Sequence, residues 1–148
     1  MRVLILLGIA LGVAAQFAAG ASPKDACGLL TRSEVTTAIG EPLKTVKGGT
    51  SSTGALYCTY TGNDTHLLVR GIALVAASDY VAQRYKSYLS LMKPAKPVSG
   101  IGAAAVSDGT AVLARNAHAM VEVAPQFKGA GVTLSAVELL AKKALARA

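Results

Sequence analysis

Two histidines, His66 and His118, are the plausible general bases for a hydrolase in this chain. A catalytic triad needs a nucleophile and an orienting carboxylate in contact with its base. Neither histidine accompanies a Gly-x-Ser-x-Gly turn, which holds the nucleophile in many hydrolases. We interpret both as surface or strand-end residues and predict that the protein is not an enzyme. A small periplasmic hydrolase with His66 or His118 as its base remains the alternative.

The sequence contains no set of residues at the spacing that a metal site or a pair of acid–base carboxylates would need. A zinc site needs three or four ligands at characteristic spacing, and two distant histidines with two cysteines do not supply one. We therefore expect no metal and no cofactor. The carboxylates that could act in pairs are Asp64, Asp79, Asp108 and Glu122. We interpret Asp64 and Asp108 as turn residues, Asp79 as an acidic residue at the start of a helix, and Glu122 as a solvent-facing strand residue.

Residues 1–21 have the pattern of a secretory signal peptide. Arg2 precedes a long apolar run that ends in small residues suited to signal peptidase. The run is shorter than the roughly 20 apolar residues that cross a bilayer. Cleavage after Gly20 or Ala21 leaves a mature chain of one domain, residues 22–148, with no transmembrane span. We expect it in the periplasm or outside the cell.

Cys27 and Cys58 are the two cysteines of the chain. An even number of cysteines in a small exported domain is read as a disulfide framework, and two allow a single pairing. A redox or metal pair would place two cysteines two residues apart, which these are not. The sequence therefore predicts a structural disulfide between Cys27 and Cys58.

The chain is basic, with 15 Lys and Arg residues against 8 Asp and Glu, and loss of Arg2 lowers the formal net charge from +7 to +6. Such a charge favours anionic partners. Tyrosines and an arginine interleave in one segment, where they could stack on sugar rings or bases, or form the margin of a buried helix face. Export leaves little reason to meet nucleic acid. The possible binding surface comprises Tyr80, Arg84, Tyr88, Lys44 and Lys47.

Helix signals stand at both ends of the mature chain. Thr31 and Glu34 form a capping box for a helix over 32–39, and Gly40 ends it. A middle helix opens at residues 78–79, with apolar residues at helical spacing, and prolines stop it. For the last helix, Ser135 with Glu138 repeats the capping-box pattern, with Leu134 and Leu139 as a hydrophobic staple. Its buried stripe is expected at Val137, Leu140, Ala141, Ala144 and Leu145.

Strand signals lie between these helices. Residues 55–61 and 67–76 read as a β-hairpin, and Gly71 predicts a bulge or a close backbone approach. Three further strands are expected over 103–107, 110–115 and 118–124. Residues 44–54 lack periodicity and are predicted to form a mobile surface loop.

These elements give the order αββαβββα. Because hairpins and meanders dominate, we predict an α+β fold: an antiparallel sheet of about five strands with three helices on one face, a two-layer sandwich.

Short motifs resemble a family of small bacterial envelope proteins, many of them lipoproteins, classed as a domain of unknown function. The similar stretches are Cys27-Gly-Leu-Leu-Thr-Arg-Ser-Glu-Val with Gly40, Cys58-Thr-Tyr60, Gly100-Ile-Gly102 and Leu140-Ala-Lys-Lys. The resemblance implies an envelope location and a disulfide, and it transfers no catalytic residues. Unlike the lipoprotein members, this sequence has no cysteine for acylation beside its leader.

The sequence thus predicts an exported, non-catalytic binding or interaction protein whose partner is an envelope protein or an anionic polymer. It would bind through the sheet face that helices leave uncovered or through residues 44–54. A structural or assembly subunit of the envelope is a further alternative.

Overall fold

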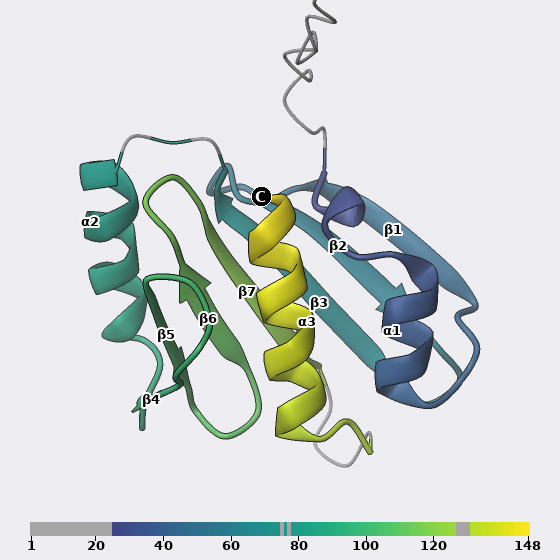
Figure 1. Cartoon of the computed structure of the whole chain (residues 1–148). Helices are drawn as coiled ribbons and strands as arrows, with labels where there is room; N and C mark the ends of the chain where they lie inside the picture. Colours follow the sequence, from purple (N-terminus) through teal and green to yellow (C-terminus); the bar gives the residue numbers. More distant parts are fainter. Residues whose placement is uncertain (1–24, 75, 77, 127–130) are drawn as a thin grey trace, which may run out of the picture.

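The computed structural model describes residues 25–74, 76, 78–126 and 131–148 (Figure 1). The predicted signal peptide, residues 1–21, lies outside the described residues. Within them the fold is α+β, as expected, with three α-helices and one open antiparallel sheet. The described part of the chain has seven strands rather than about five, in the order β1-β2-β3-β7-β6-β5-β4.

The helices and strands follow one another along the described chain with short connections. Their bounds are η1 (Cys27–Leu29), α1 (Arg32–Ile39), β1 (Thr45–Thr50), β2 (Leu56–Thr61), β3 (His66–Ala73), α2 (Ser78–Leu89), β4 (Lys96–Pro97), β5 (Ala104–Ser107), β6 (Val112–Arg115), β7 (Met120–Pro125) and α3 (Leu134–Arg147).

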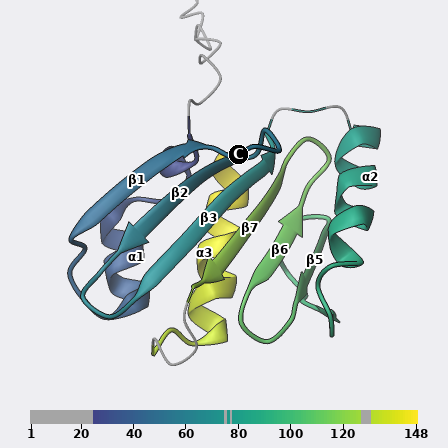
Figure 2. The same cartoon turned by 180° about the vertical axis from the view of Figure 1, so that it is seen from behind.

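The two faces of the sheet are covered differently. Helices η1, α1 and α3 pack on one face, here called the covered face, over a core of aliphatic side chains. The other, here called the open face, carries α2 on its β5–β6–β7 side, where Val81 and Tyr85 bury against Leu113 and Met120. Figure 2 shows strands β1, β2 and β3 lying bare on that face. Since α2 lies opposite the other helices, a two-layer sandwich with all helices on one face is wrong.

Residues 44–54, expected to form a mobile loop, contain an edge strand instead. Strand β1 pairs along its whole length with β2, from Thr45 opposite Thr61 to Thr50 opposite Leu56. An edge strand packs against a neighbour on one side only, so it needs no alternation of apolar residues. The second unexpected strand, β4, is a two-residue edge strand ending at Pro97, where a missing backbone N–H is tolerated.

The first hairpin agrees with its prediction. Strands β2 and β3 pair in continuous register, and the pairing of β3 with β7 shifts between Gly71 and Ala73, which confirms the bulge. A Cβ on Gly71 would lie 2.6 Å from Leu74 Cδ1. Glycine therefore lets the chain fold back over the bulge at the end of the strand.

Helix α1 begins and ends as predicted. Thr31 Oγ1 accepts from the Glu34 N–H at 3.2 Å, and the Glu34 carboxylate accepts from the Thr31 N–H at 2.9 Å. Gly40 is left-handed at φ 74°, and its N–H donates to the Thr36 carbonyl. Each end of the helix therefore has capping hydrogen bonds from nearby residues.

Helix α3 begins earlier than predicted, because Thr133 rather than Ser135 is its N-cap. Thr133 is extended and its Oγ1 accepts from the Ala136 N–H at 3.2 Å. With Thr133 as the N-cap, Leu134 is the first residue of the helix, so Leu134 and Leu139 do not hold the positions of a hydrophobic staple. The predicted stripe is confirmed: the buried residues of α3 are Val137, Leu140, Ala141, Ala144 and Leu145.

The predicted disulfide is present, with Cys27 and Cys58 Cα atoms 4.9 Å apart and sulfurs 1.99 Å apart. It joins η1 to β2. Nearby, the buried Tyr60 hydroxyl lies 3.1 Å from the Cys27 carbonyl and 3.0 Å from the Leu30 carbonyl. Burial, together with the charges of Asp25 and Glu34, raises the pKa of Tyr60 to about 12, so it remains a hydrogen-bond donor at neutral pH.

The C-terminal helix is tied to the same region by an ion network. Arg147 donates to both carboxylate oxygens of Glu34 at 2.7 and 2.8 Å and to the Leu29 carbonyl at 3.0 Å. Lys143 donates to Glu34 at 3.1 Å. Hydrogen bonds and ion pairs therefore connect α1 and α3 on the covered face.

Candidate functional site

The uncovered part of the open face carries a row of chemically varied side chains. Gly49, Tyr57, Arg70 and Glu122 are directly opposite one another on β1, β2, β3 and β7. Directly opposite residues of antiparallel strands have Cβ atoms about 5 Å apart on the same face. The register therefore builds a continuous strip running from a glycine through a ring to an ion pair.

A second row runs beside the first. Lys47, Thr59, Leu68 and Ala124 are opposite one another on the same four strands. The β strand period of two places this row on the same face as the first. Together the two rows combine aromatic, hydroxyl, aliphatic and cationic groups, a mixture suited to binding rather than to a dry core.

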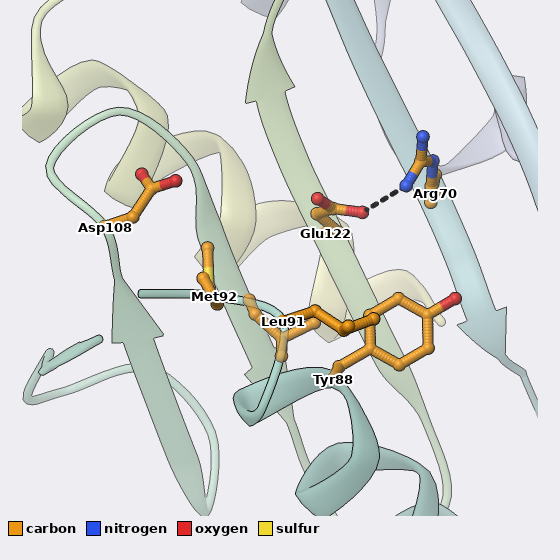
Figure 3. A pocket seen from close by; sticks show the side chains of 7 residues that line it. Arg70, Tyr88, Leu91, Met92, Asp108 and Glu122 are labelled. Atoms are coloured by element: carbon orange, nitrogen blue, oxygen red, sulfur yellow. Dashed lines mark hydrogen bonds and ion pairs between the residues drawn. The ribbon is translucent and has the colours of Figure 1, made fainter. Parts of the chain in front are cut away.

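Two adjoining hollows lie over these rows. One, of about 190 Å³, lies between the end of α2 and the ion pair (Figure 3). The other, of about 480 Å³, extends over β2 and β3 towards the β1–β2 turn. Both are bordered by Arg70, Tyr88 and Leu91, so we treat them as one groove, here called the sheet groove.

Arg70 and Glu122 form the polar floor of the sheet groove, with Arg70 Nη1 3.1 Å from Glu122 Oε2. Burial raises the pKa of Glu122 above its ordinary value, against the opposing effect of the Arg70 charge. Arg70 has 43% of its side chain exposed, and Glu122 has 18%. Within the described residues the guanidinium has no second partner, so its remaining N–H groups are available to a ligand.

Tyr57 provides the aromatic surface of the groove because its neighbour lacks a side chain. A Cβ on Gly49 would lie 2.8 Å from Tyr57 Oη and 3.0 Å from Cζ. The ring therefore lies across the Gly49 backbone. Any larger residue at position 49 would push the ring outward.

Hydroxyl groups border the groove at the β1–β2 turn. The Ser51 side chain accepts from the Ala55 N–H at 3.1 Å, and its Oγ lies 2.9 Å from Thr53 Oγ1. Gly54, left-handed at φ 80°, completes the turn. Ser51, Ser52 and Thr53, which follow β1 in the expected loop, thus line one side of the groove.

The opposite wall comes from the end of α2. Leu91 is 80% exposed, and Tyr88 packs partly against the core beneath the helix. Figure 3 shows both side chains beside the Arg70–Glu122 pair. Tyrosine is among the residues enriched in surfaces that contact a partner, and the exposed Leu91 adds apolar area beside it.

The predicted binding residues fall in two separate places. On α2, the Arg84 guanidinium lies 6.0 Å from the Tyr80 ring and 5.7 Å from the Tyr88 ring, so these three stack on one another. Lys47 is on β1, the edge strand of the sheet, and Lys44 directly precedes that strand. Tyr88 alone of the five lines the sheet groove, and Lys47 lies beside Thr59 at its border.

The two histidines lie at opposite ends of the β3–β7 pair. His66 Nδ1 is 3.2 Å from Thr61 Oγ1, directly across the β2–β3 hairpin. His118 is exposed in the turn before β7, where its N–H donates to Asn116 Oδ1. Neither histidine borders the sheet groove.

Tyr57, Thr59, Arg70 and Leu91 are groove residues that the sequence reasoning did not select. A usable signal was present: alternation along residues 55–61 and 67–76 assigns Tyr57 with Thr59, and Leu68 with Arg70, to one face each. It could not assign the two strands to the same helix-free face, because that depends on where α2 packs.

No cluster of three or more His, Cys, Asp or Glu residues in the described part could hold a metal ion. The helices described are too short or too polar to cross a bilayer. Comparison of the chain with protein-family profiles, with curated proteins and with solved structures finds no match. The resemblance to envelope proteins therefore stays a prediction.

Proposed function

We propose that this protein is an exported, non-catalytic binding protein of the bacterial envelope, which binds its partner in the sheet groove. The observation that carries the proposal is the groove itself. On the open face, Tyr57 and Arg70 lie on strands that no helix covers, and Tyr88 and Leu91 border them from the end of α2. Aromatic residues and arginine are the residue types enriched where proteins bind partners.

The remaining features agree with an envelope location and an anionic partner. A leader over residues 1–21 and the disulfide between Cys27 and Cys58 are typical of exported proteins. The basic balance of the chain draws anionic molecules towards it. Arg70 lines the groove, and Lys47 is directly opposite Thr59, another residue that lines it.

The test is site-specific cross-linking in the native host. A photoreactive amino acid replaces Thr59, which lines the groove, and in a control strain it replaces Ala146, which is exposed on α3. We expect adducts of the mature protein from position 59 and none from position 146.

Equal adducts from both positions, or none from position 59, would contradict binding in the groove. An adduct at twice the mass of the mature chain would support the alternative of an assembly subunit.

A further inference from the structure

We propose that the sheet groove binds an acidic polysaccharide, with a uronate ring stacked on Tyr57 and its carboxylate paired with Arg70. The proposal rests on the proposed function, since it names the chemistry of the partner in the same groove. It follows from three neighbouring features: a flat ring, an accessible guanidinium and a hydroxyl border.

The ring supplies a surface for a sugar. Tyr57 Oη and Cζ lie 2.8 and 3.0 Å from the position that a Cβ on Gly49 would take, and the Tyr57 side chain lines the sheet groove. One face of a pyranose is made of C–H groups, which are apolar and slightly positive. Such a face packs against the negative face of an aromatic ring.

The guanidinium supplies charge complementarity. Arg70 is directly opposite Tyr57, about 5 Å away between Cβ atoms. That spacing suits a carboxylate attached to a sugar ring on Tyr57. Arg70 Nη1 donates to Glu122 Oε2, which leaves the other N–H groups of the guanidinium to pair with a carboxylate. Lys47, on the neighbouring row, adds a second positive charge for the next uronate unit.

The borders favour a hydroxyl-rich chain over a flat surface or an apolar peptide. Ser52, Thr53 and Thr59 present hydroxyl groups on the side of the groove near Tyr57. The Tyr88 and Leu91 side chains stand on the opposite side. A membrane surface cannot reach a floor that lies between two walls, whereas a single polysaccharide chain can.

The experiment is a calorimetric titration of the mature protein with tetragalacturonate at low ionic strength. Matched probes are a neutral tetrasaccharide and a tetraglutamate peptide of the same charge. We expect tetragalacturonate to bind at least about tenfold more tightly than either probe, because it alone offers both the ring and the charge.

Four variants locate the site. Tyr57→Ala and Arg70→Gln should each weaken tetragalacturonate binding about tenfold, while Tyr57→Phe, which keeps the ring, should retain affinity within about twofold. Lys142→Gln on α3 removes the same charge as Arg70→Gln outside the groove and should change little. Far-ultraviolet circular dichroism confirms that each variant is folded, and the conservative Tyr57→Phe and Arg70→Gln changes carry the test if Tyr57→Ala does not fold.

Failure of this inference differs from failure of the proposed function. Equal affinity for tetraglutamate and tetragalacturonate, or affinity unchanged by the Tyr57 and Arg70 variants, would overturn the polysaccharide proposal. So would undetectable uronate binding. If cross-linking at Thr59 still yields a partner, that partner has different chemistry. If both experiments fail, the groove is not a binding site.

Discussion

The two faces of the sheet are built from alternate residues of the same strands, yet they differ in kind. On β2, Cys58 and Tyr60 are buried towards the covered face, while Tyr57 and Thr59 line the sheet groove. On β3, Leu67 and Val69 belong to the core, whereas Leu68 and Arg70 line the groove. The covered face is packed under η1, α1 and α3, whereas the open face has a smaller buried cluster under α2 and the sheet groove beside it.

The contacts that stabilise the protein and the groove that could bind a partner lie on different faces of the sheet. The disulfide, the Tyr60 hydroxyl and the Glu34 network all act on the covered face, where η1, α1 and α3 meet. The open face has an ion pair on a partly exposed arginine. We therefore expect changes to the covered face to affect stability, and changes to the groove to affect binding.

The largest effect is expected from the disulfide. Replacing both Cys27 and Cys58 by Ser should lower the free energy of unfolding by about 3.5 to 4 kcal/mol, because the unfolded chain regains the freedom of a 31-residue span. Urea unfolding of oxidised wild type, reduced wild type and the double variant measures this. A loss below about 1 kcal/mol would contradict the importance of the bridge to the covered face.

The next effect comes from two adjacent leucines on α3. Leu140 is buried and Leu139 is 55% exposed. Leu140→Ala should cost about 3 kcal/mol, since it opens a cavity in the core, whereas Leu139→Ala should cost about 0.5 kcal/mol or less. Thermal unfolding of the two variants measures the difference. Similar costs at both positions would show that α3 is placed wrongly on the sheet.

The ion pairs of Glu34 with Lys143 and Arg147 should make the free energy of unfolding depend on pH in the acidic range. The Arg147 hydrogen bonds, followed by the Thr31 N–H, hold the pKa of Glu34 far below its ordinary value of 4.5. Its contribution is therefore present above pH 4.5 and is lost as the pH falls below it. Glu34→Gln should cost about 1 kcal/mol at pH 7, and that cost should shrink steadily as the pH falls below 4.5 towards the lowered pKa of the folded state, measured by urea unfolding. A cost independent of pH would contradict the ion network.

The smallest effect is expected on the open face. There stability should fall as the pH rises, whereas the Glu34 contribution falls as the pH drops. Since burial raises the pKa of Glu122, the folded protein holds the proton more tightly than the unfolded chain, and its ionisation lowers stability as the pH rises through 4.5. Glu122→Gln should change stability by under about 1 kcal/mol at pH 7 and flatten that fall. Urea unfolding from pH 4 to pH 7 compares it with Glu34→Gln. A large loss at pH 7 would show that the ion pair is structural.

Local chemistry made several elements predictable. Helix α1 was correct at both ends because Thr31, Glu34 and Gly40 satisfy its end groups within a few residues. The β2–β3 hairpin and the buried stripe of α3 followed from side-chain periodicity. Strand β1 was missed because its partners are backbone groups of β2, and the α3 cap was misplaced because Thr133 and Ser135 both suit the role.

The candidate site was less predictable than the fold. Tyr88 and Lys47 were selected for their chemistry, but Tyr80 and Arg84 stack beside the helix, and Tyr57 and Arg70 were not selected. A groove between β2, β3 and the end of α2 depends on which strands are neighbours and which face a helix occupies. Those are long-range facts that no short segment contains.

The sequence by itself determined the helix ends, the strand periodicity and the identity of the two cysteines, since each depends on residues close together or on a count. The tertiary structure decided that α2 packs opposite α1 and α3, and that Gly49, Tyr57, Arg70 and Glu122 form one row. Strand alternation gives each side chain a face, but pairing and packing over long distances determine which faces meet and which stay open.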